Sequence, residues 1–241
     1  MNTLILNKTM DREDLIDYPA STVKKELSRL ARNLFLQGVP FAVNGFLKKR
    51  FYVRWYKMWE YARSLAYLDI KEGDRVLDFG GGATLPVFYL AGKGCEIISV
   101  DLNDKLVSHA NEVSEKKGWK LKSSTVNLCE KDIPVQWGVF KYIITFCTIE
   151  HLPTGNRHTV LKKLSDRLIS GGIMAITFDY GQEAPTENPL KGPLDVEELI
   201  LASGLDIIGN RDFSDNEKRY RLKNNSKYYP YTFGSLFLKK R

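Results

Sequence analysis

The 241-residue sequence carries a net charge of +7, and its 43% hydrophobic and 27% charged residues suit one globular unit with an elaboration. No apolar run approaches the roughly 18 residues that a membrane-spanning helix needs. The N-terminal segment lacks the basic start of a secretory signal, so we expect a cytoplasmic protein without membrane insertion. Cys95, Cys129 and Cys147 lie far apart, which predicts reduced thiols and excludes a disulfide framework or a clustered cysteine metal site.

The positive charge is unevenly distributed along the chain. Residues 217–241 contain eight basic residues and one acidic residue, an excess equal to that of the whole sequence. A second basic cluster lies among aromatic side chains and consists of Lys48, Lys49, Arg50, Arg54 and Lys57. Most of these charges suit a solvated surface, although cations mixed with aromatic rings also suit a phosphorylated substrate, nucleic acid or another anionic surface.

The sequence pattern of the first 70 residues predicts mainly helices. Residues 1–20 are polar and mixed, which indicates a loose arm or a short helix. Ser21 can cap a helix over residues 23–35, where the leucines recur at helical spacing. Residues 44–68 look mainly helical and are rich in aromatic residues, at least half of which we expect to pack on a sheet.

The segment with the clearest chemistry is RVLDFGGGAT, residues 75–84. Its apolar residues suit a buried parallel strand, and residues 85–91 read as the start of a helix. Between them stand Gly80, Gly81 and Gly82. Glycine permits positive φ angles and lets a ligand approach main-chain N–H groups. Strand, glycine turn and helix together predict a nucleotide-binding turn.

Two carboxylates strengthen this prediction. Asp101 ends a predicted second strand over residues 96–100 and follows Gly80 by 21 positions. An acidic residue at that spacing can accept hydrogen bonds from a ribose diol. Asp78 ends the first strand directly before the glycines, whereas NAD-type turns usually place the first glycine there without an acid.

The rest of the chain alternates between strand and helix patterns. Gly171 and Gly172 are predicted to stop a helix, and residues 182–193 are predicted to form a loop over the site. The alternation predicts an α/β fold with a doubly wound sheet of seven strands, in which ligands bind at the carboxyl ends of the strands. The further predicted strands cover residues 120–126, 140–146, 173–178, 205–209 and 231–238, and the further helices cover 103–117, 156–168 and 195–203.

These motifs resemble those of the class I S-adenosylmethionine-dependent methyltransferases. The segment from Asp78 to Thr84 matches their first motif, with Thr84 at the third glycine position, and the run Glu150-His151-Leu152-Pro153 follows the fourth strand as in bacterial members. The resemblance covers roughly residues 50–241. It implies a Rossmann-like sheet with an antiparallel last strand. It also implies an N-terminal arm and helical cover over residues 1–70, ahead of a cofactor-binding domain over residues 71–241.

The resemblance also implies S-adenosyl-L-methionine as the cofactor. Asn127 stands where family members often carry an acid that binds the adenine amino group, and Asp132 is the alternative for that role. The implied cofactor-binding residues are Asp78, Gly80, Gly81, Gly82, Asp101, Leu102, Asn127, Leu128 and Phe146.

The acceptor side is predicted at the ends of the fourth and fifth strands. Glu150 and His151 follow the fourth strand, and Asp179 follows the fifth, so these are the candidate catalytic residues. The imidazole of His151 suits proton removal near neutral pH if the acceptor is a hydroxyl. The alternative is that one of the Glu150–His151 pair caps the next helix and the other orients the loop.

A metal-dependent mechanism is the alternative to direct transfer. Small-RNA and ubiquinone-pathway O-methyltransferases resemble this region and use Glu-x-x-Glu-His, but here Cys147 replaces the first glutamate. A hard Mg²⁺ ion would lose an oxygen ligand there, which predicts that no metal is bound.

The sequence therefore predicts a methyltransferase that acts on an oxygen or nitrogen of a small molecule or glycan, phosphorylated acceptors included. An RNA methyltransferase is the alternative that the basic, aromatic flanks keep open. A further alternative is a binding subunit that keeps the cofactor fold without catalysis.

Overall fold

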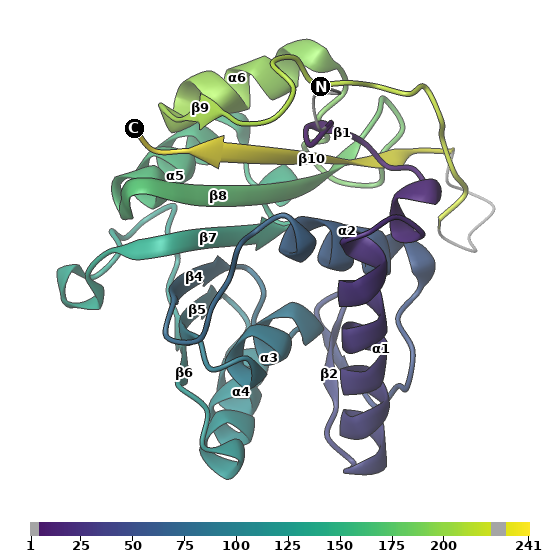
Figure 1. Cartoon of the computed structure of the whole chain (residues 1–241). Helices are drawn as coiled ribbons and strands as arrows, with labels where there is room; N and C mark the ends of the chain where they lie inside the picture. The colour runs from purple at the N-terminus through teal and green to yellow at the C-terminus, as the bar shows by residue number, and fades with distance from the viewer. Residues whose placement is uncertain (1–4, 223–229) are drawn as a thin grey trace.

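The computed structural model describes residues 5–222 and 230–241, and its centre is one mixed β-sheet with helices on both faces (Figure 1). The strand order is β1-β10-β8-β7-β4-β5-β6, and β9 pairs with β10. The strands are β1 Lys8–Thr9, β4 Arg75–Phe79, β5 Glu96–Asp101, β6 Leu121–Thr125, β7 Phe140–Phe146, β8 Leu168–Tyr180, β9 Asp206–Ile207 and β10 Thr232–Lys239. The predicted α/β fold with its doubly wound sheet is confirmed.

The parallel half of the sheet places the glycine turn at its middle. β4 pairs in parallel with β5 on one side and with β7 on the other, so Asp78 lies level with Ser99 and Ile144. β5 continues to β6, and β7 continues to β8, again in parallel. The carboxyl ends of these five strands therefore meet along one edge, where the order of strands reverses at β4, the place at which such sheets bind ligands.

The last part of the sheet is antiparallel, as predicted. β10 runs antiparallel to β8 from Thr232, opposite Tyr180, to Lys239, opposite Ile173. The eighth strand, β1, was not predicted: Lys8 pairs with Ser235 in the N-terminal segment, which was expected to be a loose arm or a short helix. The sheet thus has the seven predicted strands and one short addition at β10.

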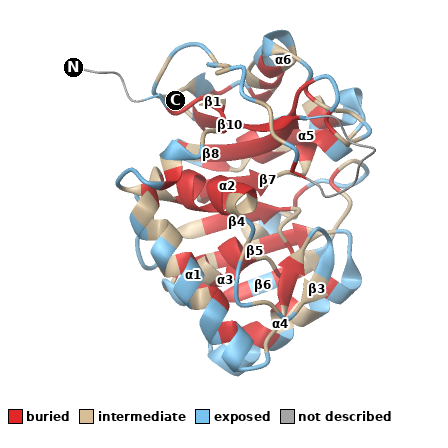
Figure 2. Cartoon of the chain, turned by 90° about the vertical axis from the view of Figure 1, so that its right-hand side faces the viewer, coloured by how far each residue is buried: buried red, intermediate tan, exposed pale blue. Residues whose placement is uncertain are grey.

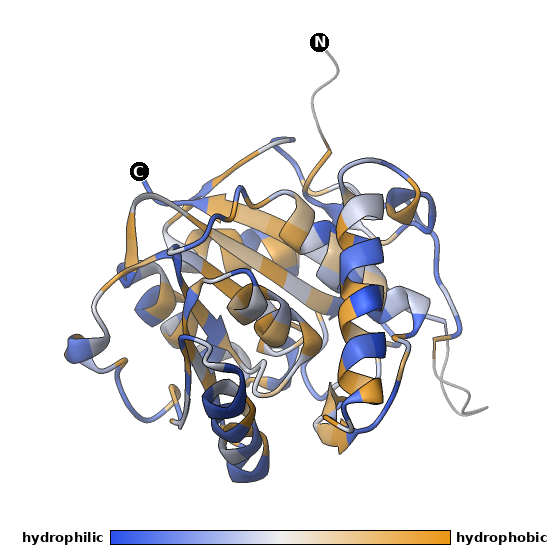
Figure 3. Ribbon diagram, turned by 60° about the horizontal axis from the view of Figure 1, so that its bottom comes forward, coloured by the Kyte–Doolittle hydropathy of each residue, from blue (hydrophilic) through white to orange (hydrophobic). Residues whose placement is uncertain are grey.

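Two apolar cores form because neighbouring residues of a strand point to opposite faces. Val76 packs with the residues of α1 to α4, and Leu77 packs with those of α5 and α6. Figure 2 shows the buried strands lying between these helical layers, and Figure 3 shows the polar outer faces of α1 and α4. The helices are α1 Ala20–Leu36, α2 Trp55–Ala66, α3 Leu85–Gly92, α4 Asp104–Lys117, α5 Thr154–Asp166 and α6 Pro193–Ser203.

The chain also contains the short 3₁₀ helices η1 Glu13–Leu15, η2 Val135–Trp137 and η3 Ile149–His151. None of the helices within those ranges has the length and apolar character that crossing a membrane requires. The division of the chain at residue 70 remains a prediction.

The prediction of helix from residue 44 is wrong for its first part. β2 Phe41–Val43 and β3 Phe46–Lys48 form a hairpin around Asn44-Gly45, and the helix α2 begins only at Trp55. Asn44 has φ +50° and Gly45 has φ +74°, which is the left-handed conformation that a two-residue hairpin turn requires. The turn chemistry therefore outweighed the helical spacing of the aromatic residues.

The prediction that Gly171 and Gly172 stop a helix is also wrong. The helix α5 ends at Asp166, and both glycines lie inside the 13-residue strand β8. Gly171 has φ +78° and donates a backbone hydrogen bond to Lys240. A Cβ on Gly172 would lie 3.0 Å from the carbonyl oxygen of Lys141, so these glycines allow an irregular start of β8 close to β7.

Candidate active site

A cavity of about 570 Å³ opens at the carboxyl edge of the parallel strands, which is a common size for a small-molecule site. Residues that follow β4, β5, β6, β7 and β8 all line it, so the topology brings together side chains separated by up to a hundred positions. Nine of the predicted site residues line this cavity, namely Gly80, Gly81, Asp101, Leu102, Asn127, Leu128, Glu150, His151 and Asp179.

The remaining three predicted residues support the wall instead. Among the described residues, Asp78, Gly82 and Phe146 are absent from the lining. Asp78 is buried behind the turn, a Cβ on Gly82 would lie 2.9 Å from the Asp101 carboxylate, and the ring of Phe146 lies 6.0 Å from that of Tyr61. Whether any of the twelve contacts a cofactor remains a prediction.

The glycine turn leaves no room for side chains. Gly80 has φ +80°, and a Cβ there would lie 2.3 Å from Cγ2 of Thr148 in the loop after β7. A Cβ on Gly81 would lie 2.1 Å from the Asp78 carboxylate. The helix α3 starts directly after Thr84, so the turn presents main-chain N–H groups at a helix N-terminus, as an anionic or polar ligand requires.

The buried carboxylate of Asp78 holds the shape of this turn through hydrogen bonds. Its Oδ2 accepts hydrogen bonds from the Ser99 hydroxyl at 2.6 Å and from the Gly81 N–H at 3.1 Å. Burial raises the pKa of Asp78 to about 8, against the lowering by the Ser99 hydrogen bond, and the nearby Asp101 raises it further. Asp78 thus acts on a ligand through the backbone that it holds.

Asp101 and Asn127 lie at one end of the cavity, beyond the carboxyl ends of β5 and β6. Asp101 accepts a hydrogen bond from the Asn103 N–H at 2.9 Å, and burial raises its pKa. Asn127 Oδ1 accepts from the Cys129 N–H at 3.1 Å, so its amide oxygen is already partly engaged. Asp132, the alternative to Asn127, does not line the cavity and forms an ion pair with Lys163.

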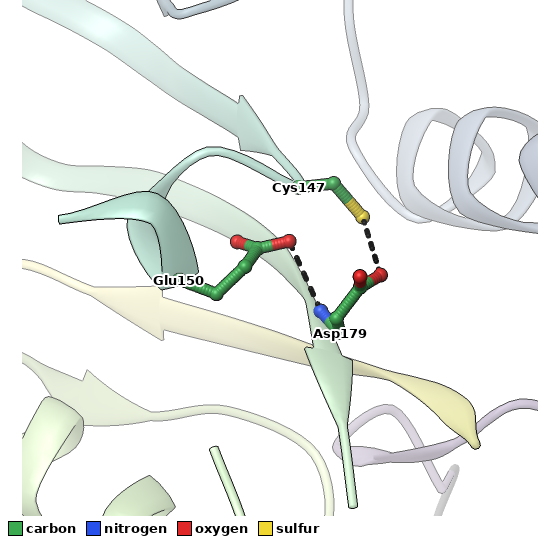
Figure 4. A group of neighbouring side chains, drawn as sticks. All are labelled: Cys147, Glu150 and Asp179. Carbon is green, nitrogen blue, oxygen red and sulfur yellow. Dashed lines mark hydrogen bonds between the residues drawn. The ribbon is translucent and has the colours of Figure 1, made fainter. Parts of the chain in front are cut away.

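The other end of the cavity is acidic and buried. The side chains of three residues turn toward one another here: Cys147 directly after β7, Glu150 in η3 and Asp179 in β8 (Figure 4). Glu150 Oε1 accepts a hydrogen bond from the Asp179 N–H at 3.1 Å, and the Cys147 thiol lies 3.8 Å from Asp179 Oδ1. His151 lines the same end of the cavity but is exposed.

The loop that carries Glu150 is held in place from α5. The buried Arg157 donates a hydrogen bond from Nε to the Ile149 carbonyl at 3.0 Å, and its Nη2 donates to the carbonyls of Leu152 and Asn188. Cys147 has φ +49°, an uncommon conformation for a residue other than glycine. The backbone here is therefore constrained so that Glu150 faces the cavity.

The sequence reasoning missed two charged residues of α2. Glu60 is fully buried, accepts from the Cys147 thiol at 2.8 Å and from the Thr177 hydroxyl at 3.1 Å, and pairs with Lys57 at 2.9 Å. Lys57 lines the cavity. The signal available in the sequence was a charged pair three positions apart within an aromatic, core-facing helix. Burying charged groups costs free energy, so such a pair on an apolar helix face indicates a specific role.

Burial and mutual repulsion shift the protonation of this acidic end. Burial, followed by the charge of Glu60, holds the pKa of the Cys147 thiol well above its usual value. Burial and the charge of Asp179 raise the pKa of Glu150 to about 8. Burial lowers the pKa of Lys57, but the surrounding acidic groups outweigh burial and keep this pKa well above its usual value. A titratable cluster of this kind in a cavity is typical of a functional site.

The sulfur and carboxylate oxygens of Cys147, Glu150 and Asp179 lie within 4.8 Å of one another, a separation that a metal ion could bridge. In the structure the thiol instead donates to Glu60 at 2.8 Å, and its sulfur lies 3.8 Å from Asp179 Oδ1. The absence of a metal remains a prediction.

Comparison with known proteins finds similarity in the central part of the chain. Residues 76–172 match a family model described as "Methyltransferase domain". The chain is 56% identical to the ribosomal RNA small subunit methyltransferase B of Thermus thermophilus over 36 residues. This match covers 15% of this chain and 9% of that protein. It is 25% identical to the carboxy-S-adenosyl-L-methionine synthase of Shewanella frigidimarina over 145 residues. This match covers 60% of this chain and 56% of that protein. The chain thus spans little more than half the length of these relatives at most.

The fold is similar to that of solved methyltransferase structures. A TehB-like SAM-dependent methyltransferase from Corynebacterium glutamicum superposes with a TM-score of 0.56 at 16% identity, covering 92% of this chain and all of that one. At this identity the likeness concerns the fold, and the position of the cavity at the strand ends agrees with it.

Proposed function

We propose that the chain is a class I S-adenosylmethionine-dependent methyltransferase, because residues 76–172 match a methyltransferase domain and the fold is that of such enzymes. On this proposal it transfers a methyl group from S-adenosyl-L-methionine to an oxygen or nitrogen of a small molecule or glycan. The observation that carries the proposal is that one cavity joins the glycine turn and Asp101 to the buried acidic end at Glu150 and Asp179. A cofactor end and an acceptor end in one enclosed space are what direct transfer requires.

The residues fit the cofactor. Gly80 and Gly81 line the cavity without side chains, so a ligand can approach their main chain, and the Asp101 carboxylate in the same lining suits hydrogen bonds from a ribose diol. When bound, S-adenosyl-L-methionine supplies a methyl group that its sulfonium already activates. The protein's part is then to align the acceptor, to exclude water and to remove a proton.

The roles on the acceptor side follow from exposure and position. His151 lies at the exposed rim and suits proton removal from a hydroxyl, whereas Glu150 and Asp179 lie in the buried wall and suit binding and orientation. The loop over residues 181–192 lies beside this end, because Thr186 lines the cavity. We assign Glu150, His151 and Asp179 as the acceptor-side residues.

Calorimetry with S-adenosylhomocysteine tests the cofactor assignment. The wild type should bind, and Asp101→Ala should weaken binding by roughly 10- to 100-fold, because hydrogen bonds to a charged group contribute about 1.5–3 kcal/mol. Asp132→Ala is the matched control: this carboxylate is absent from the cavity lining and should leave the affinity unchanged. A wild-type protein that binds no S-adenosylhomocysteine would refute the proposal.

An RNA acceptor is the second candidate, and one observation favours it. A smaller cavity of about 100 Å³ adjoins the first at Tyr56 and Lys57, and its described lining includes Lys48, Arg50 and Arg54 but no acidic residue. Phosphate contacts there would make RNA binding fall steeply with salt. Filter binding with mixed RNA over rising salt tests this candidate, and no binding at low salt would eliminate it.

A further inference from the structure

The smaller cavity that adjoins the main cavity of about 570 Å³ carries positive charge that no carboxylate balances. We call it the basic pocket, because Lys48, Arg50 and Arg54 line it and no acidic residue of the described ranges does. In those ranges none of the three pairs with a carboxylate, and residues 1–4 and 223–229 contain no aspartate or glutamate. Like charges gathered in this way repel one another, so the pocket attracts an anion.

A fourth cation in the lining, Lys57, is already engaged. It pairs with Glu60 at 2.9 Å, and its charge also acts on Glu150 and Asp179 in the main cavity. The charge available to a ligand in the basic pocket therefore comes from the three cations that have no acidic partner.

Aromatic neighbours orient two of these cations and leave their charge intact. Arg50 is half-buried, and its guanidinium carbon lies 5.8 Å from the centroid of the Tyr52 ring. Arg54 donates a hydrogen bond from Nη1 to the Tyr56 hydroxyl at 3.1 Å. A ring face or a neutral hydroxyl does not neutralise a guanidinium, and each guanidinium has five N–H donors, so donors remain for a ligand.

The basic pocket has a fixed position beside the main cavity. The two cavities share Ala42, Asn44, Tyr56 and Lys57 in their linings. The hairpin of β2 and β3 is tied to the glycine turn, because the Ala42 N–H donates a backbone hydrogen bond to the Ala83 carbonyl at 2.7 Å. A molecule with one group in the basic pocket therefore has its remainder at the main cavity.

We propose that the basic pocket binds a phosphate monoester group of the methyl acceptor. The inference rests on the proposed methyltransferase function and narrows the acceptor to phosphorylated molecules. A phosphate monoester carries about −1.5 to −2 charges at pH 7 and three acceptor oxygens, which suits three cations better than the single charge of a carboxylate. Arg50 and Arg54 can each present paired N–H donors to these oxygens, and Lys48 adds a compact charge.

The size of the basic pocket favours a single phosphate group over an RNA strand. Its volume of about 100 Å³ equals that of roughly three water molecules in the liquid, which suits one phosphate. A nucleic-acid strand needs a positively charged groove that follows several successive phosphates. The three cations instead line one small cavity, as the phosphate of a small acceptor requires.

Inorganic phosphate tests the pocket without knowledge of the acceptor. NMR titration of the whole chain at pH 8 and constant ionic strength should show saturable phosphate binding to the wild type, both with and without S-adenosylhomocysteine. Glucose 6-phosphate should bind as well and glucose should not, because the two sugars differ only in the phosphate group.

Arg50→Gln should weaken phosphate binding roughly 10- to 100-fold, the effect of losing charge-assisted hydrogen bonds, and Arg50→Lys should lose less because it keeps the charge. Lys48→Gln provides the same test if Arg50→Gln does not fold. Arg32→Gln on α1 is the matched control, since this exposed arginine lines neither cavity and should bind phosphate as the wild type does. All four variants should keep the S-adenosylhomocysteine affinity within about twofold, because none of the three positions lines the main cavity.

A lipid is a second source of the same phosphate chemistry. Vesicles of phosphatidylcholine and phosphatidic acid present a phosphate monoester on a membrane surface. Sedimentation of the wild type and of Arg32→Gln with these vesicles, but not of Arg50→Gln, would support the pocket and assign the phosphate to a lipid acceptor. Binding of glucose 6-phosphate without sedimentation would support the pocket and assign the phosphate to a soluble acceptor.

The remaining outcomes separate the inference from the proposed function. A wild type that binds S-adenosylhomocysteine but no phosphate would overturn the phosphate pocket alone, as would phosphate binding that Arg50→Gln and Lys48→Gln both retain. A wild type that binds phosphate but no S-adenosylhomocysteine would refute the methyltransferase assignment, and with it the role of the phosphate in an acceptor. RNA binding that Arg50→Gln weakens, in a protein that does not bind inorganic phosphate, would overturn the inference in favour of an RNA acceptor.

Discussion

Replacing Gly80 with alanine should weaken the fold and the cofactor site together. Gly80 has φ +80°, a conformation that costs an L-residue about 1–2 kcal/mol. The new Cβ would also lie 2.3 Å from Cγ2 and 2.4 Å from Oγ1 of Thr148, so Thr148 must move. Forcing an extra methyl group into a packed site costs about 1–3 kcal/mol. The expected loss in the free energy of unfolding is therefore about 2–5 kcal/mol.

Two other glycines separate the contributions. Gly118 ends α4 with φ +64°, and a Cβ there would have no heavy atom within 4 Å, so Gly118→Ala should cost only the conformational 1–2 kcal/mol or so. Gly155 lies in α5 at an ordinary angle and also has open space, so Gly155→Ala should be neutral or stabilising by up to about 1 kcal/mol. The difference between Gly80→Ala and Gly118→Ala then measures the clash with Thr148.

Urea denaturation of the three variants provides these free energies, and calorimetry with S-adenosylhomocysteine follows the site. Because Thr148 leads into the loop of Glu150, its displacement should also lower cofactor affinity in Gly80→Ala but not in Gly118→Ala. A Gly80→Ala protein as stable as Gly118→Ala would show that the turn has more room than the structure gives it.

Two further predictions concern protonation. Because folding raises the pKa of Asp78 to about 8, the folded state keeps a proton that the unfolded state releases, so the free energy of unfolding should fall as pH rises from about 4 to 8. Denaturation at pH 5 and pH 8 measures this fall, and Asp78→Asn should reduce it by up to about 4 kcal/mol. An equal pH dependence in the two proteins would refute the shift. His151→Ala should lower kcat by roughly 10²–10⁴ with a hydroxyl acceptor, at unchanged S-adenosylhomocysteine affinity. A variant that keeps full turnover would show that His151 is not the base.

The glycine turn and the carboxyl edge could be predicted because their causes are local. A strand pattern, three glycines and two carboxylates at a fixed spacing specify how the backbone turns, and a parallel sheet then brings its strand ends together whatever the loops contain. The hairpin at residues 41–48 had a local signal too, since Asn44-Gly45 is a strong hairpin turn, but the aromatic spacing around it favoured a helix.

The buried pair of α2 could not be predicted from local pattern alone. Glu60 contacts Cys147 and Thr177, residues 87 and 117 positions away, and these contacts arise only after α2 packs on the sheet. A charged pair on a core-facing helix hints at a buried role, but the fully buried position of Glu60 also depends on Cys147 and Thr177 from other elements. Long-range polar contacts of this kind leave no periodic trace in sequence.

The pairing of β1 with β10 sets the timing of folding during synthesis. The carbonyl of Lys8 and the hydroxyl of Ser235 that bonds to it are 227 positions apart, and Asn7 accepts a hydrogen bond from the Phe237 N–H. At about 5–20 residues per second, the ribosome needs roughly 10–50 s to deliver the second partner after the first. Until then the backbone groups of β1 that pair with β10 can bond only to water. A chaperone that shields this segment would act within that interval.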